Sequence, residues 1–319
     1  METLYLVVPC YNEEAVLPET VKRLTEKLTS MIEQGIVSEN SRMLFVNDGS
    51  KDETWDIIDY FCDENPLVAG INLSRNKGHQ NALMAGLMVA KEYADMVISL
   101  DADLQDDINA IDKFVEKYYE GCDIVYGVRS ARKTDTFFKK TTAEAFYKLM
   151  KWFGVDIVFN HADYRLMSRR ALYDLENFKE VNLFLRGIVP LIGYKSDVVE
   201  YERNERFAGE SKYPLKKMLN FAFDGITSFS IKPIRFITGI GSIIFAVSLL
   251  VLIIGAIVRL CGGAFTRFFP LGSLICLMGS LQLIAIGIVG EYVGKNYMET
   301  KARPKYFIER INDKNMVEM

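Results

Sequence analysis

The chain has 319 residues, of which 50% are apolar and 25% are charged, and its formal net charge is −4. This length suits one large or two moderate domains, and the nearly balanced charge gives no support for nucleic-acid binding through a broadly basic surface. The five cysteines are scattered and only two histidines are present, which favours a reduced cytosolic setting over a disulfide or zinc framework.

The N-terminal part of the chain alternates short aliphatic runs with stretches of helical period. This pattern predicts an α/β fold with a Rossmann-like, mostly parallel sheet and flanking helices. The expected strands are Leu4 to Val8, Met43 to Asn47, Val68 to Leu73, Met96 to Leu100 and Ile124 to Gly127. The expected helices are Glu14 to Glu33, Thr54 to Asp63, Gln80 to Glu92 and Ile108 to Tyr119. Met1 to Thr3 has no basic start, so we expect no signal peptide.

Polar groups follow three of the predicted strands at the points where those strands end. They lie in Pro9 to Glu14, Asn47 to Ser50 and Asp101 to Asp103. Because ligands of such folds gather at the carboxyl ends of strands, we expect one shared binding site. Each group also has a plainer interpretation, since Asn12 can cap the next helix, Asp48 can form an Asx turn, and an Asp at a strand end can form a turn.

Asp101 and Asp103 are one residue apart at the end of the apolar run from Met96 to Leu100. Mg²⁺ and Mn²⁺ take oxygen ligands, usually one or two carboxylates, and leave other positions to water and substrate phosphates. The pair therefore predicts a divalent cation that carries a diphosphate. Nearby, Asn76 to Ala82 opens a predicted helix whose N-terminus favours a phosphate or a sugar hydroxyl.

Two long apolar stretches occur in the C-terminal third. Phe236 to Val258 and Pro270 to Gly290 contain no charged residue, and each has about the ~20 residues that a membrane-spanning helix needs. We expect both to span, although two buried helices of a soluble domain are the alternative. Lysines and arginines before the first stretch and after the second predict that both flanks are cytoplasmic.

Tyr213 to Ile231 mixes apolar residues at helical spacing with lysines, which suits a helix in the membrane interface or, alternatively, a core helix. The predicted organisation is a catalytic domain over 1–212, a juxtamembrane helix over 213–235, spans over 236–258 and 270–290, and a cytosolic segment over 291–319.

As a set, these motifs resemble the inverting family 2 glycosyltransferases of GT-A fold. Within that family the chain looks most like bactoprenol glucosyltransferases and shares features with dolichyl-phosphate mannose synthases, which are membrane enzymes that move a sugar from a nucleotide to polyprenyl phosphate. The segments that carry the resemblance are Val8 to Glu14, Asn47 to Ser50, Lys77 to Gly86, Asp101 to Gln105, Tyr164 to Arg169, Phe207 to Tyr213 and the two apolar stretches.

The resemblance implies roles for particular residues. Those assigned to the nucleotide-sugar donor are Pro9, Tyr11, Asn12, Glu13, Asp48, Ser50, Lys77, Gln80, Asp101, Ala102 and Asp103. Those assigned to the cation, Mg²⁺ or Mn²⁺, are Asp101, Asp103 and Gln105. Those assigned to the acceptor phosphate are Arg129, Arg186, Arg203, Arg206, Ser211 and Lys212. A basic flank that attracts anionic lipid is the plainer interpretation of the juxtamembrane lysines.

The implied reaction is one inverting displacement, in which the acceptor phosphate attacks the anomeric carbon as the nucleoside diphosphate departs. A phosphate is largely ionised near neutral pH and needs little help from a base. Asp163 matches the position proposed as a base in relatives, yet it can also bind a sugar hydroxyl or orient Arg165; Asp103 completes the predicted catalytic pair.

We expect UDP-glucose as the first donor to test, a lipid-linked sugar for cell-envelope glycans as the product, and a homo-tetramer from the resemblance alone. The Gln-x-x-Arg-Trp motif of processive synthases is absent, which disfavours polymerisation. Two alternatives remain: a glycosyltransferase acting on another lipid or glycan, and an inactive nucleotide-binding membrane scaffold.

Overall fold

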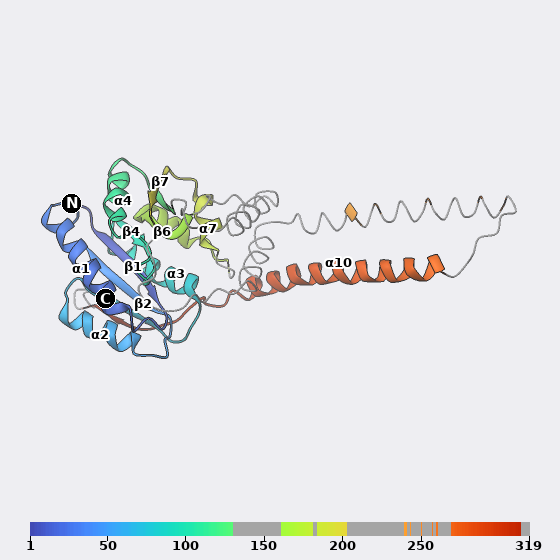
Figure 1. The fold of residues 1–319 in the computed structure, drawn as a ribbon, viewed down its shortest axis with the longest axis horizontal. Coiled ribbons are helices and arrows are strands. Elements are labelled where there is room, and N and C mark those ends of the chain that lie inside the picture. The colour runs from blue at the N-terminus through green and yellow to red at the C-terminus, as the bar shows by residue number, and fades with distance from the viewer. Residues whose placement is uncertain are drawn as a thin grey trace.

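A computed structural model of the chain describes residues 1–129, 161–180, 184–202 and 269–313, with isolated positions between 239 and 260 (Figure 1). Its strands are β1 (Leu4–Cys10), β2 (Arg42–Asn47), β3 (Val68–Leu73), β4 (Met96–Ser99), β5 (Ile124–Arg129), β6 (His161–Ser168), β7 (Ser196–Tyr201) and β8 (Ile308–Asn312). Its helices are α1 (Leu17–Glu33), α2 (Thr54–Glu64), α3 (His79–Ala90), α4 (Ala110–Tyr119), α6 (Arg169–Glu176), α7 (Leu185–Ile188), the 3₁₀ turn η1 (Val189–Ile192) and α10 (Phe269–Lys301).

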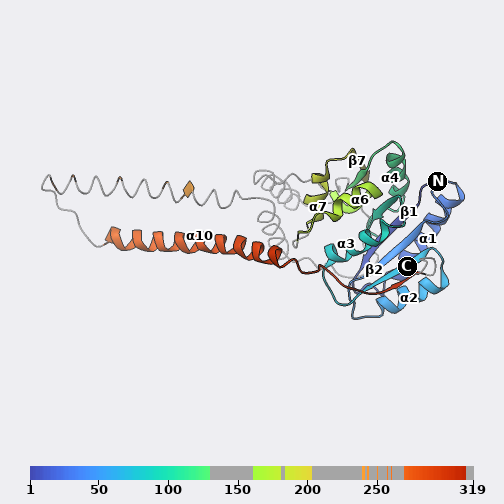
Figure 2. The ribbon, with the colours of Figure 1, turned by 180° about the vertical axis from the view of Figure 1, so that it is seen from behind.

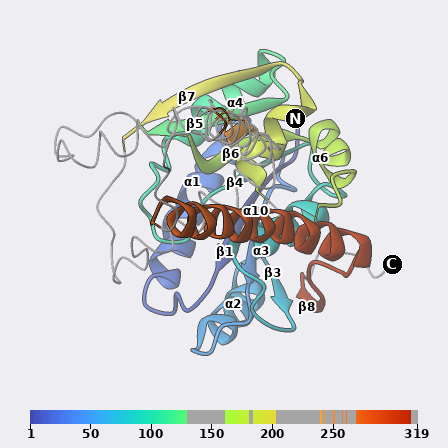
Figure 3. The same cartoon turned by 90° about the vertical axis from the view of Figure 1, so that its right-hand side faces the viewer.

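The strands form one sheet in the order β7-β5-β6-β4-β1-β2-β3-β8, with β7 and β8 at opposite edges (Figure 3). The central run β4-β1-β2-β3 is parallel, as predicted. Two strands depart from the prediction, because β6 pairs antiparallel between β4 and β5, and β8 pairs antiparallel with β3. The sheet is therefore mixed, and β6 places its residues directly beside the end of β4.

Helices cover both faces of the sheet, and alternate strand residues point to each layer. On β1, Leu4, Leu6 and Val8 pack in the core under α1, α2 and α4. Tyr5 and Val7 point the other way, into the core that α3, α6 and α7 complete. The strands are buried on both faces, which explains their nearly continuous apolar sequences.

Helix α10 projects away from the sheet, and the chain then returns to add β8 to the sheet edge (Figures 1 and 2). The predicted span Pro270 to Gly290 falls within α10. Tyr213 to Ile231 and most of Phe236 to Val258 lie outside the described residues. In the part of the chain that the structure describes, no helix has the length and hydropathy to cross a membrane. Both spans therefore stay predictions.

Candidate functional site

Two loops at the carboxyl ends of β1 and β2 are joined to each other. The Asn12 amide donates to Ser50 Oγ at 3.0 Å, and the Lys51 amide donates to Asn12 Oδ1 at 2.9 Å. Asn12 adopts a φ of 53°, in the left-handed region that Asn tolerates. Asn12 is not the helix cap that its sequence position allowed, because α1 begins at Leu17 and Val16 occupies the cap position. Instead, its side chain fixes one loop against the other.

Asp48, at the end of β2, holds the loop that leads into α3. Its carboxylate oxygens accept from the Lys77 and Gly78 amides at 2.7 and 2.9 Å. Burial raises the pKa of Asp48, and the two amide donors oppose that rise. Gly49 is required beside it, since a Cβ there would lie 2.5 Å from the Arg75 backbone carbon. The loops that follow β1, β2 and β3 thus meet, and Pro9, Tyr11, Glu13 and Lys77 lie in or next to them.

The Asp101 to Gln105 loop follows β4. Thr20 of α1 donates its hydroxyl to the Ala102 carbonyl at 2.8 Å, and the Gln105 amide donates to Asp103 Oδ1 at 3.2 Å. Leu104 has a φ of 57°, a conformation that costs a residue with a side chain about 1–2 kcal/mol. Such strain is tolerated only where the surrounding contacts impose it, and it commonly marks functional loops.

Asp106 belongs to the same loop, and the sequence analysis missed it. It is 4% exposed, accepts from the Tyr201 hydroxyl at 2.6 Å and lies 3.7 Å from the Arg129 guanidinium. Its other oxygen, Oδ2, is buried and has no hydrogen-bond partner among the described residues. Burial and the charges of Asp101 and Asp103 raise the pKa of Asp106 to about 6. The loop therefore brings the carboxylates of Asp101, Asp103 and Asp106 near one another.

Carboxylates gathered in one loop suit a divalent cation. Among the described residues, no group of three or more His, Cys, Asp or Glu side chains is arranged to hold a metal ion. Two carboxylates with substrate phosphates and water are nevertheless a normal set for Mg²⁺, so Asp101 and Asp103 suit a cation that arrives with a diphosphate. Arg129, which was predicted to bind the acceptor phosphate, lies beside this loop. Its guanidinium is near Asp106 and donates to the Tyr201 hydroxyl.

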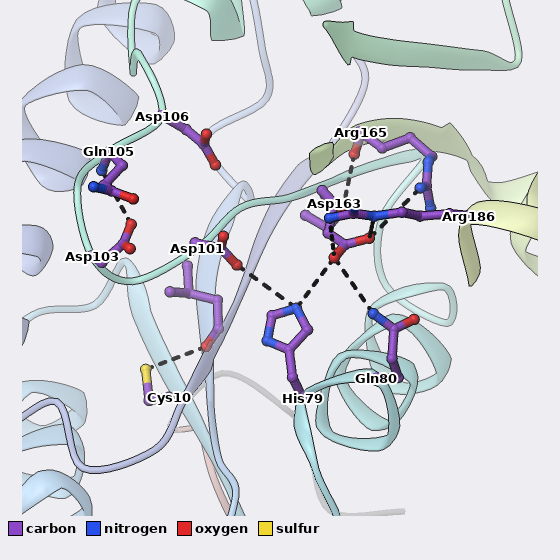
Figure 4. Close-up of polar contacts among 12 residues, drawn as sticks. Cys10, His79, Gln80, Asp101, Asp103, Gln105, Asp106, Asp163, Arg165 and Arg186 are labelled. Carbon is purple, nitrogen blue, oxygen red and sulfur yellow. Dashed lines mark hydrogen bonds and ion pairs between the residues drawn. The ribbon is translucent and has the colours of Figure 1, made fainter. Parts of the chain in front are cut away.

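Asp163 of β6 is the centre of a second cluster (Figure 4). Arg186 of α7 donates to both carboxylate oxygens, from Nε at 3.2 Å and from Nη2 at 3.1 Å. Gln80 donates at 3.4 Å, and the fully buried Arg165 lies 4.0 Å away. Burial alone would raise the pKa of Asp163, but the hydrogen bonds and charge of Arg186, with Arg165 also near, hold it well below its usual range.

His79 joins the two clusters and was also missed. Its Nε2 lies 3.7 Å from Asp101 Oδ1 and 3.7 Å from Asp163 Oδ2 (Figure 4). The sequence signal was present, since His79 stands in the segment Asn76 to Ala82, which was predicted to open a helix whose N-terminus favours a phosphate or a sugar hydroxyl. The structure brings Gln80, Asp101, Asp163 and Arg186 together around this ring.

The remaining acceptor residues cannot be placed in this cluster. Arg203, Arg206, Ser211 and Lys212 fall outside the described residues, so their predicted contact with the acceptor phosphate stays a prediction.

Carboxylates and a helix N-terminus gathered at the carboxyl ends of strands are the arrangement with which α/β folds commonly bind phosphate-bearing ligands. The chain belongs to glycosyl transferase family 2, whose profile matches residues 5–176. The uncharacterized glycosyltransferase YkoT of Bacillus subtilis (strain 168) is 55% identical over 96% of this chain and 91% of that protein. The bactoprenol glucosyl transferase of Shigella phage SfX is 42% identical over 95% of this chain and 98% of its own length. Among solved structures, mannosyl-3-phosphoglycerate synthase from Rubrobacter xylanophilus is 16% identical, with a TM-score of 0.47 over 70% of this chain and 71% of that one.

Proposed function

We propose that the protein transfers a sugar, with inversion, from a nucleotide sugar to a polyprenyl phosphate at the cytoplasmic face of a membrane. UDP is the preferred carrier and glucose the preferred sugar, and the product is a lipid-linked sugar for cell-envelope glycans. The similarity to a bactoprenol glucosyl transferase over nearly the whole chain supports the acceptor class. It also favours this reaction over transfer to another glycan and over an inactive scaffold.

One observation carries the chemistry: Asp101, the first carboxylate of the Asp101 to Asp103 pair, and Asp163, which binds Arg186, lie on opposite sides of His79. The first pair suits a cation with a diphosphate, and the second presents an arginine suited to a phosphate. In the proposed displacement, the acceptor phosphate attacks the sugar as the donor diphosphate leaves. The enzyme must therefore hold the acceptor phosphate and the diphosphate on opposite sides of the sugar. The arrangement of β4 beside β6 supplies two such sides.

The donor half would be held by the loops at β1, β2 and β4. Asn12 and Asp48 fix the loops that would enclose the nucleoside, with backbone and side chains of Tyr11 and Ser50 beside them. Asp101 and Asp103 would hold Mg²⁺ or Mn²⁺. When bound, the cation would neutralise the charge that develops on the departing diphosphate.

For the acceptor half, we assign Asp163 the orienting role rather than the role of base. A carboxylate with a depressed pKa and a bidentate arginine accepts a proton poorly. Its two bonds instead hold the plane of the Arg186 guanidinium, which suits the planar, bidentate recognition of a phosphate. An ionised acceptor phosphate can attack the anomeric carbon without a base.

Membrane attachment is part of the proposal. Apolar side chains of α10, including Leu271, Ile275, Ile284 and Ile286, are exposed in the described chain. A polyprenyl acceptor is itself a membrane lipid, so we propose that the apolar stretches anchor the enzyme beside it. A homo-tetramer remains a proposal that rests on the family resemblance.

The test is a transfer assay with the full chain in detergent, undecaprenyl phosphate and radiolabelled UDP-glucose, followed by extraction of the lipid. We expect labelled lipid in the presence of Mn²⁺ or Mg²⁺ and its loss with EDTA. Asp103→Asn should lower the rate at least about 100-fold, because a cation contributes several kcal/mol to such a transition state.

The other hypotheses predict different results. A scaffold predicts no labelled product and no change on Asp103→Asn. A transferase for another acceptor predicts consumption of donor without label in polyprenyl phosphate. A panel of UDP- and GDP-linked sugars in the same assay identifies the sugar.

A further inference from the structure

The His79 ring occupies the space between the two halves of the site. His79 is the first residue of α3, and its side chain is 36% exposed, so a ligand can reach it. Its Nε2 is equally distant, at 3.7 Å, from a carboxylate oxygen on the donor side and from one on the acceptor side. The ring therefore lies at the boundary that a transferred group must cross.

Neither of these contacts is a hydrogen bond. Both distances exceed the range in which a ring nitrogen and an oxygen share a proton. Within the described ranges, the His79 ring makes no hydrogen bond, although two carboxylates attract its N–H edge. The Nε2 edge of the ring thus faces two carboxylates, and a ring N–H there can donate to an oxygen atom of a ligand.

The segment that carries the ring is held firmly. Asp48 accepts from the two amides just before His79. Just after it, the Gln80 side chain donates to Asp163 and accepts from the Leu185 amide at 3.2 Å. Because its neighbours on both sides are fixed, His79 has the support that a side chain needs to discriminate between closely similar ligands.

We infer that His79 is a specificity-determining residue that donates a hydrogen bond from its ring to a hydroxyl group of the transferred sugar. This inference rests on the proposed function, which places the sugar between the diphosphate near Asp101 and the acceptor phosphate near Arg186. The sugar is the only part of the two substrates that must lie at that boundary. A site that donates to a hydroxyl rejects analogues that lack the hydroxyl, because the donor is then left without a partner.

Two substitutions separate the hydrogen bond from the shape of the ring. His79→Phe keeps a flat ring and removes the donor, whereas His79→Gln keeps an amide donor close to the position of Nε2. Both variants are prepared as the full chain in detergent and are assayed with Mn²⁺ present. Circular dichroism and the thermal midpoint check that each variant is folded.

The measurement compares UDP-glucose with its 2-, 3-, 4- and 6-deoxy analogues, both as donors and as ligands. If UDP-glucose is not a donor, the nucleotide hexose that gives most product takes its place. In the wild type, removal of one particular hydroxyl should lower kcat/KM by about tenfold or more. In His79→Phe this penalty should disappear for that hydroxyl alone, and His79→Gln should restore part of it. Affinity for UDP without sugar should change less than about twofold.

Two results would overturn the inference. One is an unchanged set of deoxy penalties in His79→Phe, which would leave the ring without a role in reading the sugar. The other is a loss of UDP affinity that equals the loss in kcat/KM, which would place the ring on the diphosphate instead.

Failure of the proposed function looks different. If the wild type binds nucleotide sugars but labels no polyprenyl phosphate, the acceptor assignment is wrong. The role of His79 is then tested with dissociation constants alone. If the wild type binds UDP-glucose more tightly than UDP, this difference in affinity should vanish in His79→Phe. A difference that persists in His79→Phe contradicts the inference.

Discussion

At the scale of single residues, Asp163 shows how charge sets chemistry. The carboxylate is 11% exposed and receives both donors of Arg186, with His79 and Arg165 also near it. The two arginines outweigh the effect of burial, so the folded pKa of Asp163 lies below that of an unfolded aspartate, about 3.9. Asp163 therefore contributes stability that is complete above about pH 4 and is lost as the pH falls through its folded pKa.

Asp163→Asn tests this electrostatic role. At neutral pH the variant should be less stable by about 3 kcal/mol, because Arg165 is then buried without its opposite charge. Its unfolding free energy should also fall less steeply than that of the wild type below about pH 4. Urea unfolding at several pH values measures both effects, and parallel pH profiles for the two proteins would contradict the account.

Asp106 is a second single residue with an electrostatic role, because its charge should strengthen the binding of the cation. Its charge adds to those of Asp101 and Asp103, and burial together with those two charges raises its own pKa. Asp106→Asn keeps the size of the side chain and removes this charge. The apparent affinity for Mn²⁺, measured by titration in the presence of UDP, should fall about tenfold, the lower end for residues that support metal ligands. Unchanged Mn²⁺ affinity would show that Asp106 serves only the packing of Tyr201.

At the scale of elements, α3 carries His79 and Gln80 to the site because it packs unusually close to the sheet. A Cβ on Gly86 would lie 2.4 Å from a methyl carbon of Val7 and 2.7 Å from one of Val46. Glycine at this position lets the helix backbone approach β1 and β2 directly. The position of the helix N-terminus therefore depends on a residue seven positions along the chain.

Gly86→Ala should push α3 away from the sheet and destabilise the protein by about 1–3 kcal/mol, as overpacked cores do. Val7→Ala introduced as well should recover part of this loss, because it removes one of the atoms that the new Cβ meets. Thermal unfolding of the two single variants and the double variant gives the coupling energy. Strictly additive losses would mean that the helix does not contact the strand in this way.

The sequence predicted the elements up to Arg129 because buried parallel strands and amphipathic helices leave strong apolar patterns. Strand β6 leaves no such pattern, since Asp163 and Arg165 interrupt it and their pairing is satisfied only in the folded site. Asp101 and Asp103 form a motif that is visible in the sequence because they are one residue apart at a strand end. His79 and Asp106 belong to no such motif. Their importance comes from neighbours that are distant in sequence.

At the scale of the whole molecule, the first and last parts of the chain belong to one sheet. β8 pairs with β3, and the Asn312 side chain donates to Asp59 of α2 at 2.6 Å. Any membrane that the apolar stretches enter must therefore have both ends of the described chain on the same side. Which side this is stays a prediction, and the basic flanks predict the cytoplasmic side.

Protease mapping tests that topology. In right-side-out vesicles, epitope tags at the N-terminus and the C-terminus should both be protected, and both should be cleaved once the vesicles are opened. Cleavage of one tag alone would contradict the pairing of β8 with β3, and cleavage of both in sealed vesicles would place the catalytic site outside the cell.

The central claim is that Asp101 and Asp103 hold a cation that binds the diphosphate of the donor. Calorimetric titration of the full chain with UDP tests it most directly. With Mn²⁺ present we expect saturable binding, and with EDTA or in Asp101→Asn we expect the affinity to fall at least about tenfold, which is about 1.4 kcal/mol. Equal UDP affinity in all three conditions would contradict the claim.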